Sequence, residues 1–147
     1  MNRIILIGNG FDLAHGLPTR YEDFINWYWE QWLYNLRSCH YRTLADGLCK
    51  FSIKTGQYTW QSLLWQHGYT FNAPKGVDFV NSILEDKQNF EVIQSHLLYR
   101  ICKSIQNKKW VDIENEYYRL LKESIVNPES LGCTPQEINK QLQCVLD

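Results

Sequence analysis

Hydrophobic and polar positions along the chain predict one short buried strand followed by several amphipathic helices. The apolar run at residues 4–7 ends at Gly8, as a buried strand would. Over residues 20–37, aromatic and aliphatic side chains recur every three or four positions, which predicts a largely buried helix. Three later groups repeat at helical spacing: Val77, Val80, Ile83 and Leu84; Phe90, Ile93, Leu97, Ile101 and Ile105; Trp110, Ile113, Tyr117, Leu120 and Leu121.

Short polar motifs predict where these elements begin and end. Thr19 and Glu22 have the spacing of a capping box, so we expect the first helix to begin at about residue 20. Thr134–Glu137 repeats that box with proline at the first helical position, and residues 127–132 are the best break before it. In the middle of the chain, residues 51–53 and 58–60 predict a hairpin, although residues 60–65 also fit a helix.

A glycine loop follows the predicted strand. Gly8 and Gly10 allow a sharp turn and a close approach of the backbone to another group. In open α/β sheets nucleotides bind at this end of a strand, and the start of the next helix favours phosphate. The pattern continues to Gly16 and Pro18, but Leu13 stands where a dinucleotide-binding fingerprint needs glycine. A purely structural turn is the alternative.

Residues 5–24 resemble the opening signature of the AbiH-type bacteriophage abortive-infection family. A second segment, residues 110–114, resembles a Trp-x-Asp-Ile-Glu element of that family. The glycine and proline spacing is also similar to that of sirtuin-type NAD-binding domains, from which Asn9 and Asp12 depart. The resemblance implies NAD or a related nucleotide as cofactor. The residues that would bind it are Gly8, Asn9, Gly10, Phe11, Asp12, Gly16, Pro18 and Thr19.

The resemblance also implies a fold class. We expect an α/β protein, mostly helical over residues 1–147, that opens with the strand, glycine loop and helix of a sirtuin-like nucleotide-binding fold. One confident strand cannot form a sheet, and the last predicted helix has no carboxyl cap before Asp147. Residues 1–147 are therefore expected to be a single domain or the amino-terminal fragment of a longer nucleotide-binding α/β domain.

Three residues are candidates for catalysis, each with a structural alternative. His15 lies in the loop and could act as an acid or base. Asp112 and Glu114 lie in the family-like element, but carboxylates near a helix start are also favoured by the helix dipole. Asn72 fits a turn better than a strand end. Hydrolysis of NAD is implied for the full-length protein, whereas the 147-residue chain is expected to be inactive and to bind nucleotide weakly or not at all.

Composition restricts the remaining classes of function. A net charge of −1 gives no electrostatic case for nucleic acid, and no apolar run is long enough for a membrane span. Five widely spaced cysteines without a Cys-x-x-Cys pair predict no metal site and a reduced, cytoplasmic environment.

The predicted function is phage defence through nucleotide binding. The alternative is a non-enzymatic sensor or scaffold whose aromatic helix binds a protein or nucleic-acid partner, or a second copy of the chain; the phage or host trigger cannot be read from the sequence.

Overall fold

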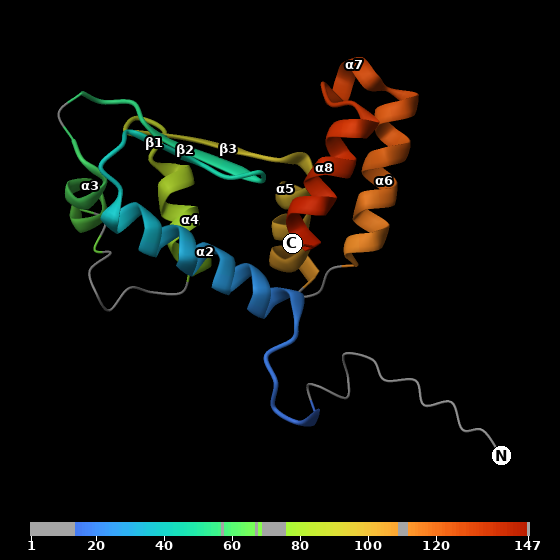
Figure 1. The fold of residues 1–147 in the computed structure, drawn as a ribbon, viewed down its shortest axis with the longest axis horizontal. Helices are drawn as coiled ribbons and strands as arrows, with labels where there is room; N and C mark the ends of the chain where they lie inside the picture. The colour runs from blue at the N-terminus through green and yellow to red at the C-terminus, as the bar shows by residue number, and fades with distance from the viewer. Residues whose placement is uncertain (1–13, 57, 67, 69–75, 109–111, 147) are drawn as a thin grey trace.

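The computed structural model describes residues 14–56, 58–66, 68, 76–108 and 112–146. A small sheet and the helices beside it form one end of the molecule, and a group of helices forms the other (Figure 1). The elements are α2 (Tyr21–Ser38), β1 (Thr43–Ala45), β2 (Cys49–Ile53), α3 (Trp60–Gln66), α4 (Gly76–Glu85), β3 (Phe90–Gln94), α5 (His96–Lys108), α6 (Ile113–Val126), α7 (Pro128–Leu131) and α8 (Pro135–Leu146). The chain is thus mostly helical with some strand, as predicted.

The sheet is antiparallel, with strand order β1-β2-β3. Phe51 at its centre pairs with Leu44 on one side and Val92 on the other. It therefore differs from the parallel sheet of a nucleotide-binding α/β domain. The predicted strand at residues 4–7 and the glycines Gly8 and Gly10 lie outside the described residues.

Helix α2 forms the centre of the core. Trp29 and Leu36 are 1% and 0% exposed, and the ring of Trp32 lies 4.7 Å from that of Phe51 between centroids. Core packing therefore explains most of the aromatic stripe, and the predicted range of 20–37 is shifted by one residue. Among the described residues, no helix is long and apolar enough to cross a membrane.

The start of α2 corrects the predicted capping box. Arg20, not Thr19, is the N-cap residue, and its backbone N–H donates to Asp23 Oδ2 at 3.1 Å. The reciprocal carboxylate is therefore Asp23 instead of Glu22. Thr19 lies just outside the helix, where its backbone N–H donates to the carbonyl of Leu17 at 2.9 Å. Thr19 and Glu22 have the spacing of a capping box, but Arg20 and Asp23, one residue later, have the same spacing and also end on an acidic residue.

The predicted hairpin between residues 51–53 and 58–60 is wrong. Strand β2 does contain residues 51–53, but its partners are β1 and β3. Residues 60–66 form helix α3, the alternative that the sequence left open. Trp60, Leu63 and Leu64 are all buried, at a spacing that only a helix places on one face.

Residues 90–94 form strand β3 instead of the start of a helix. Phe90 is 3% exposed whereas Ile93 is 52% exposed, so the two do not share a buried face. Their three-residue spacing resembles that of a helix, which misled the sequence prediction. Helix α5 begins at His96. The helical patterns predicted over residues 77–84 and 110–121 correspond to α4 and α6, with residues 110 and 111 outside the described residues.

A turn at Asp46 fastens α2 to the sheet. Its Oδ2 accepts hydrogen bonds from Tyr28 Oη at 2.9 Å and Trp32 Nε1 at 3.0 Å. Its Oδ1 accepts from the backbone N–H groups of Leu48 and Cys49, both at 2.7 Å. Burial and the nearby carboxylate raise the pKa of the Tyr28 phenol well above its usual range, so Tyr28 remains a donor.

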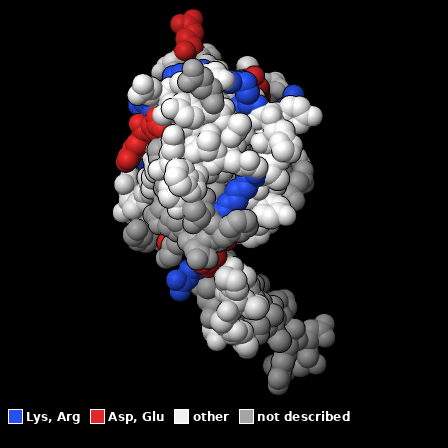
Figure 2. Space-filling view, turned by 90° about the vertical axis from the view of Figure 1, so that its left-hand side faces the viewer, with Lys and Arg blue, Asp and Glu red and all other residues white. Residues whose placement is uncertain are grey.

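The surface seen from the α3 end is largely uncharged (Figure 2). Lysine, arginine and acidic side chains are scattered over this face, with no large patch of one sign among the residues described. Exposed rings occur on both α2 and α3: Trp27 is 54%, Tyr34 69% and Trp65 73% exposed. Trp27 and Tyr34 lie on α2, which is otherwise mainly core, and Trp65 lies on α3.

The capping box of α8 is present as predicted. Thr134 donates its backbone N–H to Glu137 Oε2 at 2.8 Å, and Glu137 donates its own to Thr134 Oγ1 at 3.3 Å. The break before it contains the short α7 and Gly132, whose φ of 63° is left-handed.

We expect Thr134→Ala to destabilise the protein by about 1 kcal/mol, as loss of an N-cap hydroxyl does. Hydrogen bonds from the Thr134 backbone and hydroxyl lower the pKa of Glu137. A lowered folded-state pKa stabilises the fold above the unfolded-state pKa, about 4.3, and that stabilisation is lost as the pH falls through the folded-state value. Urea unfolding should therefore show a difference between wild type and Thr134→Ala at pH 7 that shrinks below pH of about 4. A difference that grows in acid would contradict this assignment.

Candidate functional site

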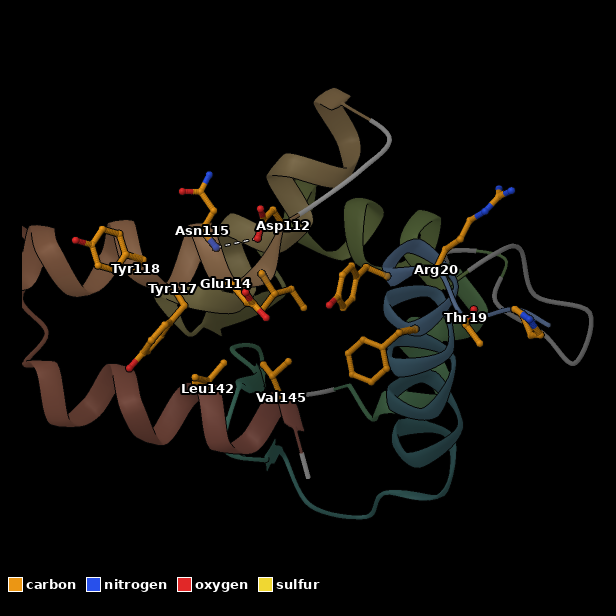
Figure 3. Close-up of a pocket in the computed structure, with 13 residues that line it drawn as sticks. Thr19, Arg20, Asp112, Glu114, Asn115, Tyr117, Tyr118, Leu142 and Val145 are labelled. Carbon is orange, nitrogen blue, oxygen red and sulfur yellow. Dashed lines mark hydrogen bonds between the residues drawn. The ribbon is translucent and has the colours of Figure 1, made fainter. Parts of the chain in front are cut away.

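A cavity of about 970 Å³ lies where the start of α2, the start of α6 and the end of α8 meet (Figure 3). The segment before α2 contributes Pro18, Thr19 and Arg20 to its wall. The other residues that line it are Tyr21 and Phe24 from α2; Asp112, Ile113, Glu114, Asn115, Tyr117 and Tyr118 from the α6 region; and Leu142 and Val145 from α8. We call it the loop cavity.

The loop cavity brings together residues that the sequence had singled out separately. Pro18 and Thr19 from the predicted nucleotide loop share its wall with the candidate carboxylates Asp112 and Glu114, more than 90 residues later in the chain. Gly16 has a φ of 75°, so this part of the loop uses the left-handed conformation that glycine favours.

Other predicted site residues do not belong to the cavity wall as described. His15 is exposed and is not among the residues that line it. The remaining predicted cofactor-binding residues lie outside the described residues: Gly8, Asn9, Gly10, Phe11 and Asp12. Asn72 lies outside them as well.

Asp112 and Glu114 have different local roles. Asp112 is the N-cap of α6, and its Oδ1 accepts a hydrogen bond from the backbone N–H of Asn115 at 2.9 Å. This contact stabilises the helix start and fixes the position of the carboxylate. Glu114 lies in the first turn of α6, where the helix dipole favours its charge. Of the two carboxylates, Glu114 is the one not engaged in capping.

Aromatic and aliphatic side chains supply the apolar part of the wall. Tyr117 donates its hydroxyl to Asn139 Oδ1 at 2.7 Å, which ties α6 to α8 and fixes one side of the cavity. Leu142 and Val145 point into the cavity from α8 (Figure 3). A flat ring that is apolar on its faces, such as a nucleobase, would bury its surface against such a wall.

Arg20 contributes its backbone more than its charge. Its side chain points away from Glu114 and Tyr117 in the close-up (Figure 3). The wall of the loop cavity therefore contains the carboxylates of Asp112 and Glu114 at the start of α6 and polar backbone groups at the start of α2. The sequence reasoning missed Tyr117, Leu142 and Val145 as site residues, because helical periodicity marks them only as packing positions.

The thiols near the core are not activated. Burial raises the pKa of Cys102 to about 12, although a hydrogen bond with the Trp29 side chain partly offsets this effect, and burial with Asp46 nearby raises that of Cys49 as well. Among the residues described, no group of three or more histidine, cysteine or acidic side chains could hold a metal ion.

We expect iodoacetamide at pH 8 to label the exposed Cys144 at least tenfold faster than Cys102 in the folded chain, because the thiolate is the reactive form. Mass spectrometry of tryptic peptides after timed labelling measures both rates. In urea the two rates should converge. Equal rates in the native state would contradict the partial burial of Cys102.

Comparison with known proteins identifies one family. The family model described as "Bacteriophage abortive infection AbiH" matches residues 4–143. This range includes the glycine loop, both candidate carboxylates and α8 as far as residue 143. No curated protein and no solved structure matches the chain.

Proposed function

The chain belongs to the AbiH family of bacteriophage abortive-infection proteins, and we propose that it serves this defence by binding NAD or a related nucleotide in the loop cavity. The observation that carries the proposal is the shared wall: Thr19 of the predicted nucleotide loop and Glu114 of the family-like element line one cavity.

The size and chemistry of the loop cavity support a nucleotide. Ligand sites span roughly 300–1,000 Å³, and a volume of about 970 Å³ lies within that range. Phosphate groups would bind near the start of α2, where the positive end of the helix dipole favours anions. The base would pack on the apolar wall of Tyr117, Leu142 and Val145. Glu114 would then accept hydrogen bonds from ribose hydroxyls, as acidic residues do in dinucleotide sites.

The same arrangement suggests a chemistry for the full-length protein. Cleavage of the nicotinamide–ribose bond develops positive charge on the ribose, and a carboxylate beside it would stabilise that charge. Glu114 is the residue we propose for this role. Efficient hydrolysis also needs a group that orients water, and none of the described residues that line the cavity is hydrogen-bonded to the Glu114 carboxylate. We therefore expect residues 1–147 to bind NAD weakly without hydrolysing it.

Filling the loop cavity tests the binding proposal. Leu142→Trp places a larger side chain in the wall and should weaken NAD binding at least tenfold, because the base loses its space. Lys140→Trp, on the exposed part of the same helix, is the matched control and should change affinity less than twofold. Isothermal titration calorimetry with NAD measures both, and circular dichroism shows that each variant is folded. Equal affinities for wild type and Leu142→Trp would place the ligand elsewhere.

A further inference from the structure

Helix α5 separates two smaller cavities that share part of their walls. One lies on the α4 side and has a volume of about 250 Å³. The other lies on the α6 side and has a volume of about 320 Å³. Tyr99, Lys103 and Asn107 line both, at four-residue spacing along α5. A ligand lying across these three residues would therefore reach both cavities.

The α4-side cavity has an apolar floor and amide groups at its edge. Trp29 and Val80, which are 1% and 4% exposed, form part of this floor. Asn81 and Gln106 contribute amides to its wall, and Gln106 Nε2 donates to Asn81 Oδ1 at 3.2 Å. Each amide retains further donors or acceptors beyond this bond. An apolar floor with amide groups at the cavity edge suits a planar heterocycle that carries hydrogen-bonding groups at its own edge.

The α6-side cavity is lined by cations. Arg100, Lys103 and Arg119 all contribute to it. Arg100 pairs with Glu123, and Arg119 Nη1 lies 3.8 Å from Glu116 Oε1. Three cations against two carboxylates leave one positive charge in excess.

Lys103 supplies that excess charge. Its Nζ lies 5.6 Å from the centroid of the Tyr99 ring, and it forms no ion pair within 4 Å among the residues described. Tyr99 is 53% exposed, so part of its ring remains open to solvent. A cation beside an open ring can contact a phosphate while the ring stacks on a base.

We propose that this surface is a second ligand site, which binds a nucleoside phosphate with its base in the α4-side cavity and its phosphate at Lys103. The amides would recognise the edge of the base, and the excess positive charge would hold the phosphate. The ligand is either a free mononucleotide or one nucleotide of a single strand, because both present this chemistry. The site shares no lining residue with the loop cavity and does not depend on the function proposed for it.

Binding measurements with two probes test this site. The probes are AMP and a single-stranded RNA of about ten nucleotides, within the range that one binding surface can contact. All proteins carry Leu142→Trp, so that the contribution of nucleotide binding in the loop cavity is reduced. We expect Lys103→Ala to weaken binding of the preferred probe about tenfold, as loss of a charged phosphate contact does. Lys140→Ala removes an exposed charge from α8 and is the matched control, with less than a twofold change.

A second variant tests the position of the base. Asn81→Leu removes an amide from the cavity edge and should weaken AMP binding while leaving inorganic pyrophosphate binding unchanged. Binding of AMP identifies a free nucleotide as the ligand, and binding of RNA alone identifies a single strand; either result supports the site when Lys103→Ala reduces it. The proposal is overturned if neither probe binds, or if Lys103→Ala and Lys140→Ala have the same effect.

Discussion

Asp46→Ala is expected to lower the free energy of unfolding by about 2–4 kcal/mol, the largest stability effect that we predict for a single polar side chain. The reason is the number of donors that converge on one carboxylate. Tyr28 and Trp32, which are 9% and 4% exposed, each lose a partner for a polar group inside the core. An unsatisfied buried donor costs about 1–3 kcal/mol, and two backbone N–H groups of the turn lose their acceptor as well.

Urea unfolding followed by tryptophan fluorescence measures this loss. Asp46→Asn is the matched control, because its one amide oxygen can still accept hydrogen bonds either from the two rings or from the two backbone N–H groups. It should cost less than Asp46→Ala. Asp86→Ala provides a second comparison, since the Asp86 carboxylate accepts hydrogen bonds from Asn89, three residues later in the chain. A loss below about 0.5 kcal/mol for Asp46→Ala, the range of neutral surface changes, would contradict the role assigned to this turn.

Gly16→Val is expected to weaken NAD binding at least tenfold while leaving the protein folded. Gly16 has a φ of 75°, a conformation that a β-branched residue strongly disfavours. An added Cβ would meet nothing within 4 Å, so the effect comes from the backbone and not from a clash. A change of loop conformation would displace Pro18 and Thr19, which line the loop cavity. The glycine spacing of the sequence also predicts that Gly10→Val abolishes nucleotide binding by the full-length protein; Gly10 lies outside the described residues.

Gly56→Val is the matched control for Gly16→Val. An added Cβ at Gly56 also meets nothing within 4 Å, but Gly56 does not have a left-handed φ. Its substitution should therefore leave NAD affinity within about twofold of wild type, as expected for surface positions. Calorimetric titration with NAD compares the two variants directly. If Gly16→Val bound NAD as wild type does, the loop conformation would have no part in ligand binding.

The fold could be predicted where one face of an element is strongly apolar. The stripe of α2 gave its position to within one residue, and the Thr134–Glu137 box gave the start of α8. Strand β1 could not be found, because its residues are mostly exposed and three positions are too few to show an alternation. Strand β3 was misread because Phe90 and Ile93 have helical spacing, although only Phe90 is buried.

The candidate site could be predicted only in pieces. The glycine spacing marked Gly16 and Pro18, and the resemblance marked Asp112 and Glu114. Their meeting depends on long-range contacts that no local pattern encodes, such as the hydrogen bond between Tyr117 and Asn139 that fixes α6 against α8. The turn at Asp46 is of the same kind, since its carboxylate and its ring donors are 14 and 18 residues apart.

Photo-crosslinking tests the central claim that NAD binds between the loop and α6. An azido derivative of NAD would be bound to the chain, activated by light and located by mass spectrometry of tryptic peptides. The account predicts labels in the peptides that carry Tyr21, Tyr117 and Leu142, each reduced by excess unmodified NAD and by Leu142→Trp. Labels confined to peptides outside the loop cavity, or labels that excess NAD does not reduce, would contradict it.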